Sequence, residues 1–214
     1  MTTDIVTVKS PFKSPQERRE EREAKRMAVL TAAVRMFNAR GYHATSLDDV
    51  AASLGVSKPT IYHYLGNKEQ VLVECLTIGM DQLLAAAADA RAGLGLGIDR
   101  LRAFLISYAE VNMEDFGRCN ILTANETLST EAREAIRLLK RRIHATMQEL
   151  VEDGVADGSI AVCDPKFAAL TLASALNGPS RWHRPDGPQA PSEIAVGLVD
   201  FLTAGLAPRE SQMT

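Results

Sequence analysis

Residues 41–72 read GYHATSLDDVAASLGVSKPTIYHYLGNKEQVL, and this stretch decides the fold. Gly55 can adopt the left-handed conformation that ends a helix, while Ser57 and Pro59 suit the first turn of a following one. Two short helices joined by three residues cross steeply, so the second projects from the body. That arrangement is typical of a helix-turn-helix that lays its second helix in the major groove of DNA. The apolar positions that predict the two helices are Leu47, Val50, Ala51 and Leu54, then Ile61 and Leu65.

The exposed side of the second helix combines lysine, hydroxyl and aromatic side chains. Lysine supplies charge for phosphate, hydroxyls bond to phosphate oxygens, and rings lie against thymine methyls and sugars. Tyr62, His63 and Tyr64 are consecutive, so they cannot all face inward on a helix of 3.6 residues per turn. The alternative is that one tyrosine packs inward and that His63 is a plain surface residue. The residues expected to contact DNA are Thr45, Ser46, Lys58, Pro59, Thr60, Tyr62, His63, Tyr64 and Lys68.

The rest of the chain also has helical periodicity. No run of alternating apolar and polar residues reaches strand length, so the sequence predicts an all-α fold of about nine helices. Residues 15–26 (PQERREEREAKR) are almost all charged and begin the first helix, which Gly41 ends. Further helices are expected over 68–91, 98–116, 119–127, 130–153, 165–177 and 192–206. The expected domains are a flexible arm (1–14), a DNA-binding domain (15–67), an effector-binding and dimerisation domain (68–207) and a tail (208–214).

The charge is unevenly divided along the 214 residues. Residues 1–70 carry a net charge of +3 and residues 71–214 a net charge of −6, which suits a small DNA-reading domain on an acidic body. Three widely spaced cysteines argue against a disulfide framework or a zinc site, and no metal or cofactor is expected. The longest uncharged stretch, residues 167–180, is too short to span a bilayer. We therefore expect a cytoplasmic protein without a membrane partner.

Residues 25–75 resemble the N-terminal domain of the tetracycline-repressor (TetR) family of bacterial transcription regulators. The departures are Pro59 where glycine is common, Leu65 where phenylalanine is usual and Asn67 where serine often stands. The resemblance implies a homodimer in which the first three helices read operator DNA and the remaining helices bind an effector. The motifs that carry it are Gly41-Tyr42, Thr45-Ser46, Leu54-Gly55-Val56-Ser57, Thr60-Ile61-Tyr62 and Lys68-Glu69.

The C-terminal two-thirds of the chain contain weaker signals. Phe167, Leu170 and Leu176 belong to a helix that is apolar nearly all round, and Phe201 belongs to an apolar stripe on the last helix. Such helices suit a dimer bundle, and the alternative is the core of a monomer. Residues of mixed polarity on apolar helices are the expected effector contacts: Phe104, Tyr108, Asn112, Met113, Phe116, Asn120, Asn125, Met147 and Asn177.

The most unusual local feature is Arg181-Trp182-His183-Arg184 followed by Pro185-Asp186-Gly187. Tryptophan and arginine can stack on an adenine, and arginine can bind phosphates. A WxRPDG-like run is similar to that of TetR-type regulators of fatty-acid and steroid catabolism, whose effectors are acyl-coenzyme A thioesters. Arg181, Trp182 and Arg184 are therefore expected to bind such an effector. The alternative is a loop whose tryptophan packs on the bundle and whose arginines are solvated.

Together these features predict a ligand-responsive DNA-binding regulator, and the family resemblance implies a repressor that binds a palindromic, double-stranded operator as a dimer and is released by a small molecule. One alternative is an α-helical enzyme, but His144 and His183 are isolated and no nucleophile–base pair is apparent. The other alternative is a DNA-binding protein without an effector. We therefore predict that the chain is not an enzyme.

Overall fold

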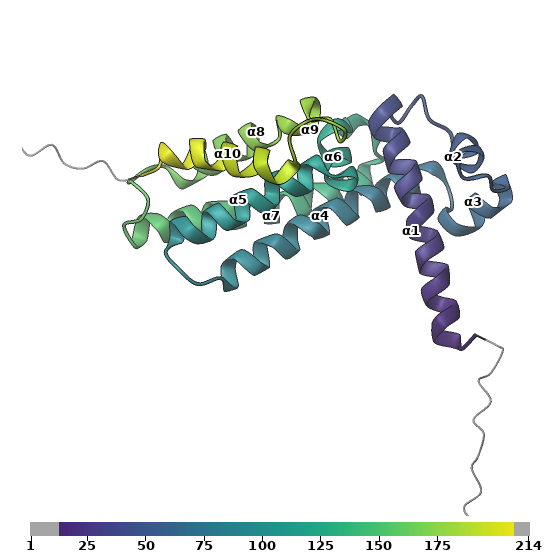
Figure 1. Cartoon of the computed structure of the whole chain (residues 1–214), viewed down its shortest axis with the longest axis horizontal. Helices are drawn as coiled ribbons and strands as arrows, with labels where there is room; N and C mark the ends of the chain where they lie inside the picture. Colours follow the sequence, from purple (N-terminus) through teal and green to yellow (C-terminus); the bar gives the residue numbers. More distant parts are fainter. Residues whose placement is uncertain (1–12, 208–214) are drawn as a thin grey trace, which may run out of the picture.

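The computed structural model describes residues 13–207 and is helical throughout that range (Figure 1). Nine helices of eight or more residues confirm the predicted all-α fold, and a short α9 and a 3-10 turn at 125–127 accompany them. The arm and tail predicted at the two ends lie largely outside the described residues. The α-helices are α1 (Pro15–Arg40), α2 (Leu47–Leu54), α3 (Lys58–Leu65), α4 (Lys68–Ala92), α5 (Gly97–Met113), α6 (Asp115–Leu122), α7 (Thr130–Ala156), α8 (Pro165–Leu176), α9 (Pro179–Trp182) and α10 (Pro191–Ala204).

The first three helices and the start of α4 enclose a small core of their own. Leu30, Val34 and Ile61 are fully buried there, and Val71 and Leu72 close the core from α4. Because α2 and α3 have only eight residues each and are too short to be stable alone, the shared core is what holds this pair at a fixed angle. In Figure 1 this head lies at one end of the molecule, with α2 and α3 on its outer side.

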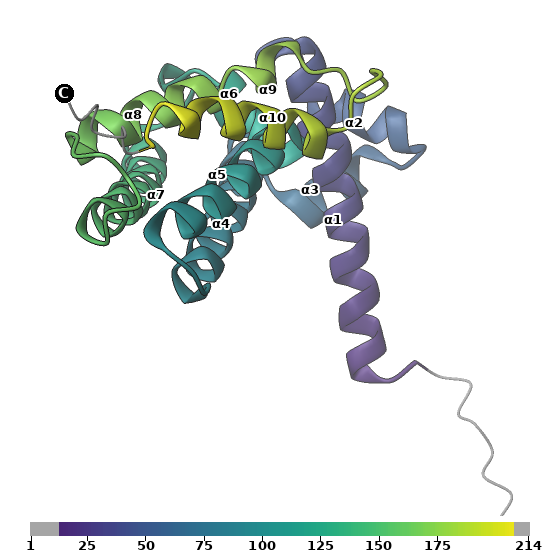
Figure 2. The same ribbon diagram turned by 60° about the vertical axis from the view of Figure 1, so that its left-hand side comes forward.

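A second core fills the body, which α4, α5, α7, α8 and α10 surround (Figures 1 and 2). Phe104, Leu105, Met147 and Leu176 are fully buried in it. Among the described residues only α4 is apolar and long enough to cross a membrane. Its apolar window is 44% buried and it packs against α5, α6 and α7, as the core helix of a soluble protein does.

The break between the helices predicted over 98–116 and 119–127 lies earlier in the structure, and residues 125–127 form a separate 3-10 turn. The chain is extended at Glu114 (φ −77°, ψ 167°), so α5 ends at Met113 and α6 begins at Asp115. The close approach of the chain at this break requires glycine at position 117, because a Cβ there would lie 2.0 Å from the Val111 carbonyl oxygen. Gly79 on α4 has no Cβ either, and one would meet the Phe116 carbonyl oxygen at 2.7 Å. The two glycines therefore let α6 lie directly against α4 and α5.

Candidate DNA interface and effector cavity

Local hydrogen bonds fix the start of α2 and the turn that follows it. The Ser46 hydroxyl accepts from the Asp49 amide, and the Asp49 carboxylate accepts from the Ser46 amide at 2.9 Å, so the two residues form a capping box. Gly55 ends α2 in the left-handed conformation (φ 64°, ψ 28°), as predicted. Ser57 precedes α3, but its hydroxyl lies 2.8 Å from the Thr60 hydroxyl and makes no bond to a backbone amide.

The structure separates the buried and exposed faces of α3. Ile61 and Leu65 are buried in the head core, whereas Tyr62 is 51% exposed and His63 is exposed beside it. Tyr64 is half-buried against the core, so it is the tyrosine that packs inward. The other predicted contact residues on α3 are Lys58 and Pro59, both exposed, and Thr60, half-buried.

Two lysines on this surface already have partners. The Lys58 ammonium lies 2.6 Å from the Asp48 carboxylate, which raises the pKa of Lys58. Lys68, in the first turn of α4, places its ammonium 4.1 Å from the centre of the Tyr42 ring. Burial lowers the pKa of Lys68. Both side chains are cationic donors at the edge of the exposed α3 face, where a phosphate could replace or join the present partner.

The expectation that the Thr45 side chain contacts DNA is wrong. Thr45 is 2% exposed, and its hydroxyl donates to the carbonyl oxygens of Gly41 at 3.0 Å and Met36 at 3.3 Å. These bonds tie the start of α2 to the end of α1. Thr45 therefore positions the reading element from inside the protein, and the exposed Ser46 next to it remains on the surface.

A small, partly open cavity lies in the body among α4, α5, α6, α7 and the end of α8. We call this 110 Å³ space the inner cavity. Several of its polar groups are already joined: the Tyr108 hydroxyl donates to Asn177 Oδ1 at 2.9 Å, and Asn112 Nδ2 donates to the same oxygen at 3.2 Å. Its lining residues are Met80, Leu83, Tyr108, Asn112, Asn120, Ile121, Lys140, Ile143, His144 and Asn177.

Three buried polar atoms of the inner cavity have no partner in the described structure: Asn112 Oδ1, Asn120 Oδ1 and His144 Nδ1. Asn112 is 1% exposed and Asn120 is 4% exposed, so bulk water does not reach these amides. Burial, together with the nearby Lys140, lowers the pKa of His144 and favours its neutral form. A buried polar group without a partner costs free energy, so these atoms favour a ligand that donates hydrogen bonds.

A larger groove continues from the inner cavity toward the surface. This outer groove has a volume of 670 Å³ and shares Asn120, Ile121, Lys140 and Asn177 with the inner cavity. Lys140 and the exposed Arg181 supply positive charge along it, and Glu126 is its one acidic lining residue among those described. The cavity and groove therefore form one path that is apolar and amide-lined inside and cationic outside.

The structure divides the remaining predicted effector residues among other places. Phe104 and Met147 are fully buried in the body core and line neither space. Met113 and Phe116 border a separate 450 Å³ hollow beside α1. Trp182, which is 55% exposed, and Arg184 border a 160 Å³ hollow at the start of α10. The Asn125 side chain lies outside the described residues.

The structure does not bring Arg181, Trp182 and Arg184 together around one hollow. Arg181 and Trp182 lie on the single turn of α9 and Arg184 follows it, and Arg181 borders the outer groove while Trp182 and Arg184 border the other hollow. Arg181 and Arg184 are exposed and Trp182 is half-exposed, so the alternative of a loop with solvated arginines stays open. Lys140 and His144 were missed by the sequence analysis. They lie one turn apart on α7, on the side that carries the buried Ile136, Ile143 and Met147. The sequence signal that could have revealed them is a cation that interrupts this buried apolar stripe.

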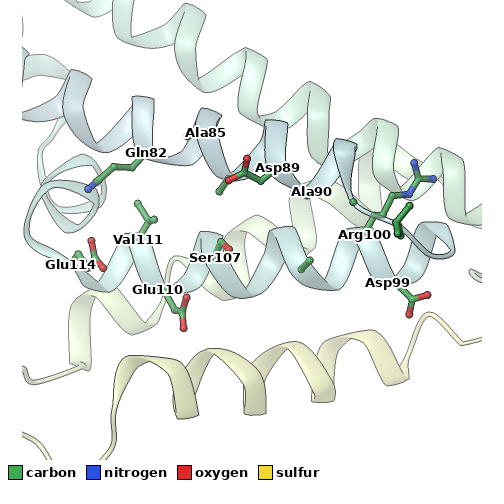
Figure 3. Close-up of a pocket in the computed structure, with 14 residues that line it drawn as sticks. Gln82, Ala85, Asp89, Ala90, Asp99, Arg100, Ser107, Glu110, Val111 and Glu114 are labelled. Carbon is green, nitrogen blue, oxygen red and sulfur yellow. The ribbon is translucent and has the colours of Figure 1, made fainter.

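A further groove lies between α4 and α5, as Figure 3 shows. This 510 Å³ groove is bordered by small side chains such as Ala85 and Ser107 and by four carboxylates, with Arg100 as the only cation among its lining residues. Because its acidic border repels anions, the groove suits an anionic effector less well than the outer groove does. The carboxylates are Asp89, Asp99, Glu110 and Glu114.

Helix α6 connects the inner cavity to the DNA-reading head. At one end of α6, Asp115 accepts from Arg35 Nε of α1 at 2.7 Å, and its carbonyl oxygen accepts from Asn38 Nδ2 at 2.8 Å. At the other end, Asn120 lines the inner cavity and donates to the Leu76 carbonyl oxygen of α4 at 3.0 Å. A ligand against Asn120 therefore touches a helix that is bonded to both α1 and α4.

The outer sides of α8 and α10 form an exposed apolar face. Phe201 is 80% exposed, Phe167 is 71% exposed and Leu170 is 48% exposed. Gly197 and Ala204 lie on the same side of α10 and would let another helix approach closely. Figures 1 and 2 both show α8 and α10 side by side at the surface of the body. Exposed apolar area of this kind is typical of a protein–protein interface.

Both halves of the chain match models of one protein family. Residues 29–75 match the model described as bacterial regulatory proteins, tetR family. Residues 95–206 match the model described as tetracyclin repressor-like, C-terminal domain.

Named relatives and solved structures agree with these matches. The repressor KstR2 of Rhodococcus jostii is 27% identical over 208 residues, which cover 90% of this chain and 96% of KstR2. The regulator PfmR of Thermus thermophilus has a solved structure that is 32% identical, with a TM-score of 0.76, and the match covers 84% of this chain and 99% of PfmR. AibR in complex with isovaleryl coenzyme A and operator DNA is 28% identical, with a TM-score of 0.70, and the match covers 83% and 97%.

Proposed function

The chain belongs to the TetR family of bacterial transcriptional regulators, and from that premise we propose that it is a dimeric repressor which an acyl-coenzyme A thioester releases from its operator. The family and the relatives are regulators, so the chain is a DNA-binding transcriptional regulator and not an enzyme. The observation that carries the proposal is the exposed aromatic and cationic face of α3 on a rigid helix-turn-helix. Its proposed location is the cytoplasm, where bacterial DNA lies.

In the proposed complex α3 enters the major groove and the start of α4 meets the backbone. Tyr62 and His63 are the most accessible ring-bearing residues of α3, and Thr60 lies one turn from Tyr64 on the same helix. Lys58 and Lys68 contact phosphates on either side of the groove. The full proposed set is Ser46, Lys58, Pro59, Thr60, Tyr62, His63, Tyr64 and Lys68, with Thr45 as an internal support.

We expect Thr60→Ala and Tyr62→Phe to reduce operator affinity more than affinity for random DNA. A lost base-pair contact costs roughly 1–3 kcal/mol of discrimination, whereas phosphate contacts are unaffected. Fluorescence anisotropy with operator and scrambled duplexes measures both affinities. Ser53→Ala, an exposed hydroxyl change on α2 outside the proposed contact set, is the control. An unchanged ratio of the two affinities in both variants would remove these side chains from base reading.

The proposed dimer forms through the exposed face of α8 and α10. Phe167, Leu170 and Phe201 would lose most of their exposed apolar area when a second copy covers them. A two-fold dimer through this face would present two copies of α3, which is why a palindromic operator is proposed. The position of this face at the body, away from α2 and α3 in Figure 1, leaves both reading helices free.

The proposed effector site is the inner cavity together with the outer groove. The 110 Å³ inner cavity is smaller than the roughly 300–1,000 Å³ of a site for a drug-sized ligand, so it admits one small group and not a whole nucleotide thioester. A short acyl group suits its apolar walls of Met80, Leu83 and Ile143. The pantetheine amides supply donors for unpartnered oxygens such as Asn120 Oδ1, and Lys140 and Arg181 meet the phosphates outside. The solved AibR complex shows that a short-chain thioester is bound by a relative.

Release from DNA is proposed to pass through α6. A ligand on Asn120 shifts the population toward a state in which α6, and with it α1, has a different position, and only differential affinity for the two states can produce this shift. Asp115 connects α6 to α1, because its carboxylate accepts a hydrogen bond from Arg35 and its carbonyl oxygen accepts one from Asn38.

We expect Asp115→Ala to retain operator binding while weakening effector-induced release about tenfold, within the range of typical allosteric coupling energies. The physical reason is that the Arg35 ion pair is lost while the effector site is untouched. Effector titrations of the preformed DNA complex give the coupling. Arg35→Gln should have the same effect, and the double variant should add little to either. Normal release in both single variants would exclude this ion pair from the coupling.

A mobility-shift assay with the DNA flanking the chain's own gene, with and without acyl-coenzyme A compounds, tests the proposed function. The repressor binds and is released. A regulator without an effector binds and is not released by any compound. If no fragment is shifted, the proposed operator does not lie beside the gene, and selection from random DNA is required.

A further inference from the structure

The first half of α1 extends away from the rest of the protein. Figures 1 and 2 show the start of α1 projecting beyond α2 and α3, and only the inner end of the segment Pro15–Arg26 meets another described helix, where Arg26 pairs with Glu74 of α4. The first buried residue of α1 is Val29, so these twelve residues contribute nothing to the core. At 1.5 Å per residue the segment is about 18 Å long. Its apolar content cannot explain why it is helical.

Local interactions stabilise the projecting helix instead. Ser14 and Glu17 form a capping box, in which the Ser14 amide donates to the Glu17 carboxylate at 2.6 Å and lowers the pKa of Glu17. Pro15 occupies the first turn. Glu21 binds Lys25 at 2.8 Å, one turn further along, and Lys13 on its other side. The helix is therefore built to persist without support from the body.

The charges on this helix are separated by sign. With 100° per residue, the five cations fall within an arc of about 120°, and the four glutamates occupy the opposite side. The cationic arc is continuous with the buried face further along α1, where Val29 and Ala33 lie. A solvated helix that only needs internal ion pairs mixes its signs around the axis. The cations are Arg18, Arg19, Arg22, Lys25 and Arg26, and we call them the α1 stripe.

Most of the α1 stripe has no anionic partner within residues 13–207. Arg26 is bonded to Glu74 of α4 through both terminal guanidinium nitrogens, and Lys25 is bonded to Glu21. Arg18, Arg19 and Arg22 are exposed, and their side chains make no hydrogen bond or ion pair to another described residue. Three guanidinium groups on one side of two helical turns repel one another unless an external anion neutralises them.

The α1 stripe begins at the reading head. Helix α1 packs against both α3 and α4 of the head. Arg26, at the inner end of the stripe, is anchored to α4 six residues beyond Lys68. The stripe therefore starts beside the first turns of α4, which follow α3 directly, and leads outward from the proposed DNA interface.

We propose that the α1 stripe is a second DNA contact, which lies along the phosphate backbone outside the half-site that α3 reads. Arginine guanidinium groups bind phosphate oxygens through paired hydrogen bonds, and such contacts carry no sequence information. Arg18 and Arg22 are one turn apart, so they can reach neighbouring phosphates of one strand. This inference rests on the proposed operator binding. It adds that each protomer covers more DNA than the helix-turn-helix alone.

The test uses the full chain with the triple substitution Arg18→Gln, Arg19→Gln, Arg22→Gln. The salt dependence of its DNA affinity is compared with that of the wild type. Each lost phosphate contact makes the slope of log K against log salt less negative by about 0.9, so loss in both protomers should change it by about two to five. We expect operator and random-DNA affinity to fall together by at least about tenfold at 0.1 M salt. Their ratio should stay the same, and hydroxyl-radical footprints should lose protection at the outer edges only.

Two further variants make the result interpretable. The control variant Arg91→Gln, Arg141→Gln, Arg142→Gln removes the same amount of charge from the surface of α4 and α7 in the body. We expect it to bind DNA as the wild type does. Arg18, Arg19 and Arg22 all changed to Lys should recover most of the salt slope. Circular dichroism confirms that the helix persists. If the wild type binds its operator and the Gln variant has the same slope and footprint, the stripe does not contact DNA. If the wild type shows no operator preference, the proposed function fails instead.

Discussion

Phe201→Asp is expected to convert the protein to monomers and to lower operator affinity by about 10²–10⁴-fold. Phe201 is 80% exposed in the protomer, so the change should leave the fold intact. In the proposed dimer the new carboxylate would be buried against a second copy of α8 and α10, which is strongly unfavourable. A monomer binds one half-site and loses the gain in effective concentration that links two half-sites. Sedimentation velocity and an operator titration measure the two effects.

A matched control separates the effect of a charge at the interface from the effect of a charge at any exposed position. Leu94 is 97% exposed on the α4–α5 connection, so Leu94→Asp places the same charge on an equally open position. We expect that variant to remain dimeric with full affinity. A dimeric Phe201→Asp protein would show that the α8–α10 face does not form the interface. A monomeric variant with wild-type affinity would show that dimerisation is not needed for operator binding.

Reversing both cations of the outer groove is expected to abolish the effector response. In the double variant Lys140→Glu, Arg181→Glu the phosphates of an acyl-coenzyme A would face two carboxylates. Charge-assisted hydrogen bonds contribute about 1.5–3 kcal/mol each, so we expect effector affinity to fall by at least about 100-fold. Operator affinity should change little, because both residues line the body groove and neither lies on α3. Isothermal titration and DNA-release assays measure these quantities.

Arg184→Glu is the control for this prediction, since Arg184 lies on the other side of α9 and does not border the outer groove. It removes an arginine from the same unusual motif while sparing the proposed path. A normal effector response in the double variant, together with a lost response in Arg184→Glu, would move the effector to the hollow that Trp182 and Arg184 border.

The sequence was most informative where a local interaction decides the structure. The Ser46–Asp49 capping box, the left-handed Gly55 and the limits of α2 and α3 could all be predicted, because each depends on residues within one or two turns. Helical periodicity alone predicted that at least one of Tyr62, His63 and Tyr64 is exposed. Which of Tyr62 and Tyr64 packs inward could not be decided, since that depends on where α1 crosses α3.

Contacts between distant segments account for the predictions that were wrong. Thr45 has a hydroxyl of the kind that binds phosphate, yet this hydroxyl donates hydrogen bonds to carbonyl oxygens at the end of α1. The break at Glu114 depends on the close approach of Gly117 to Val111, which no periodicity reveals.

The effector site shows the same limit. Tyr108, Asn120 and Asn177 were predicted and do line the inner cavity, but the fully buried Phe104 and Met147 have a similar pattern along the chain. Only the fold shows that Lys140 completes the path to Arg181.

The most direct test of the account is an anisotropy titration of the wild-type chain on the DNA that it selects from a random library. The account predicts saturation at two chains per palindromic site and a preference of at least about 10³ over scrambled DNA. It also predicts full release by a short-chain acyl-coenzyme A, with free coenzyme A and free carboxylic acid as inactive controls. A chain that selects no sequence, or that binds one and is not released by any acyl-coenzyme A, would contradict the account.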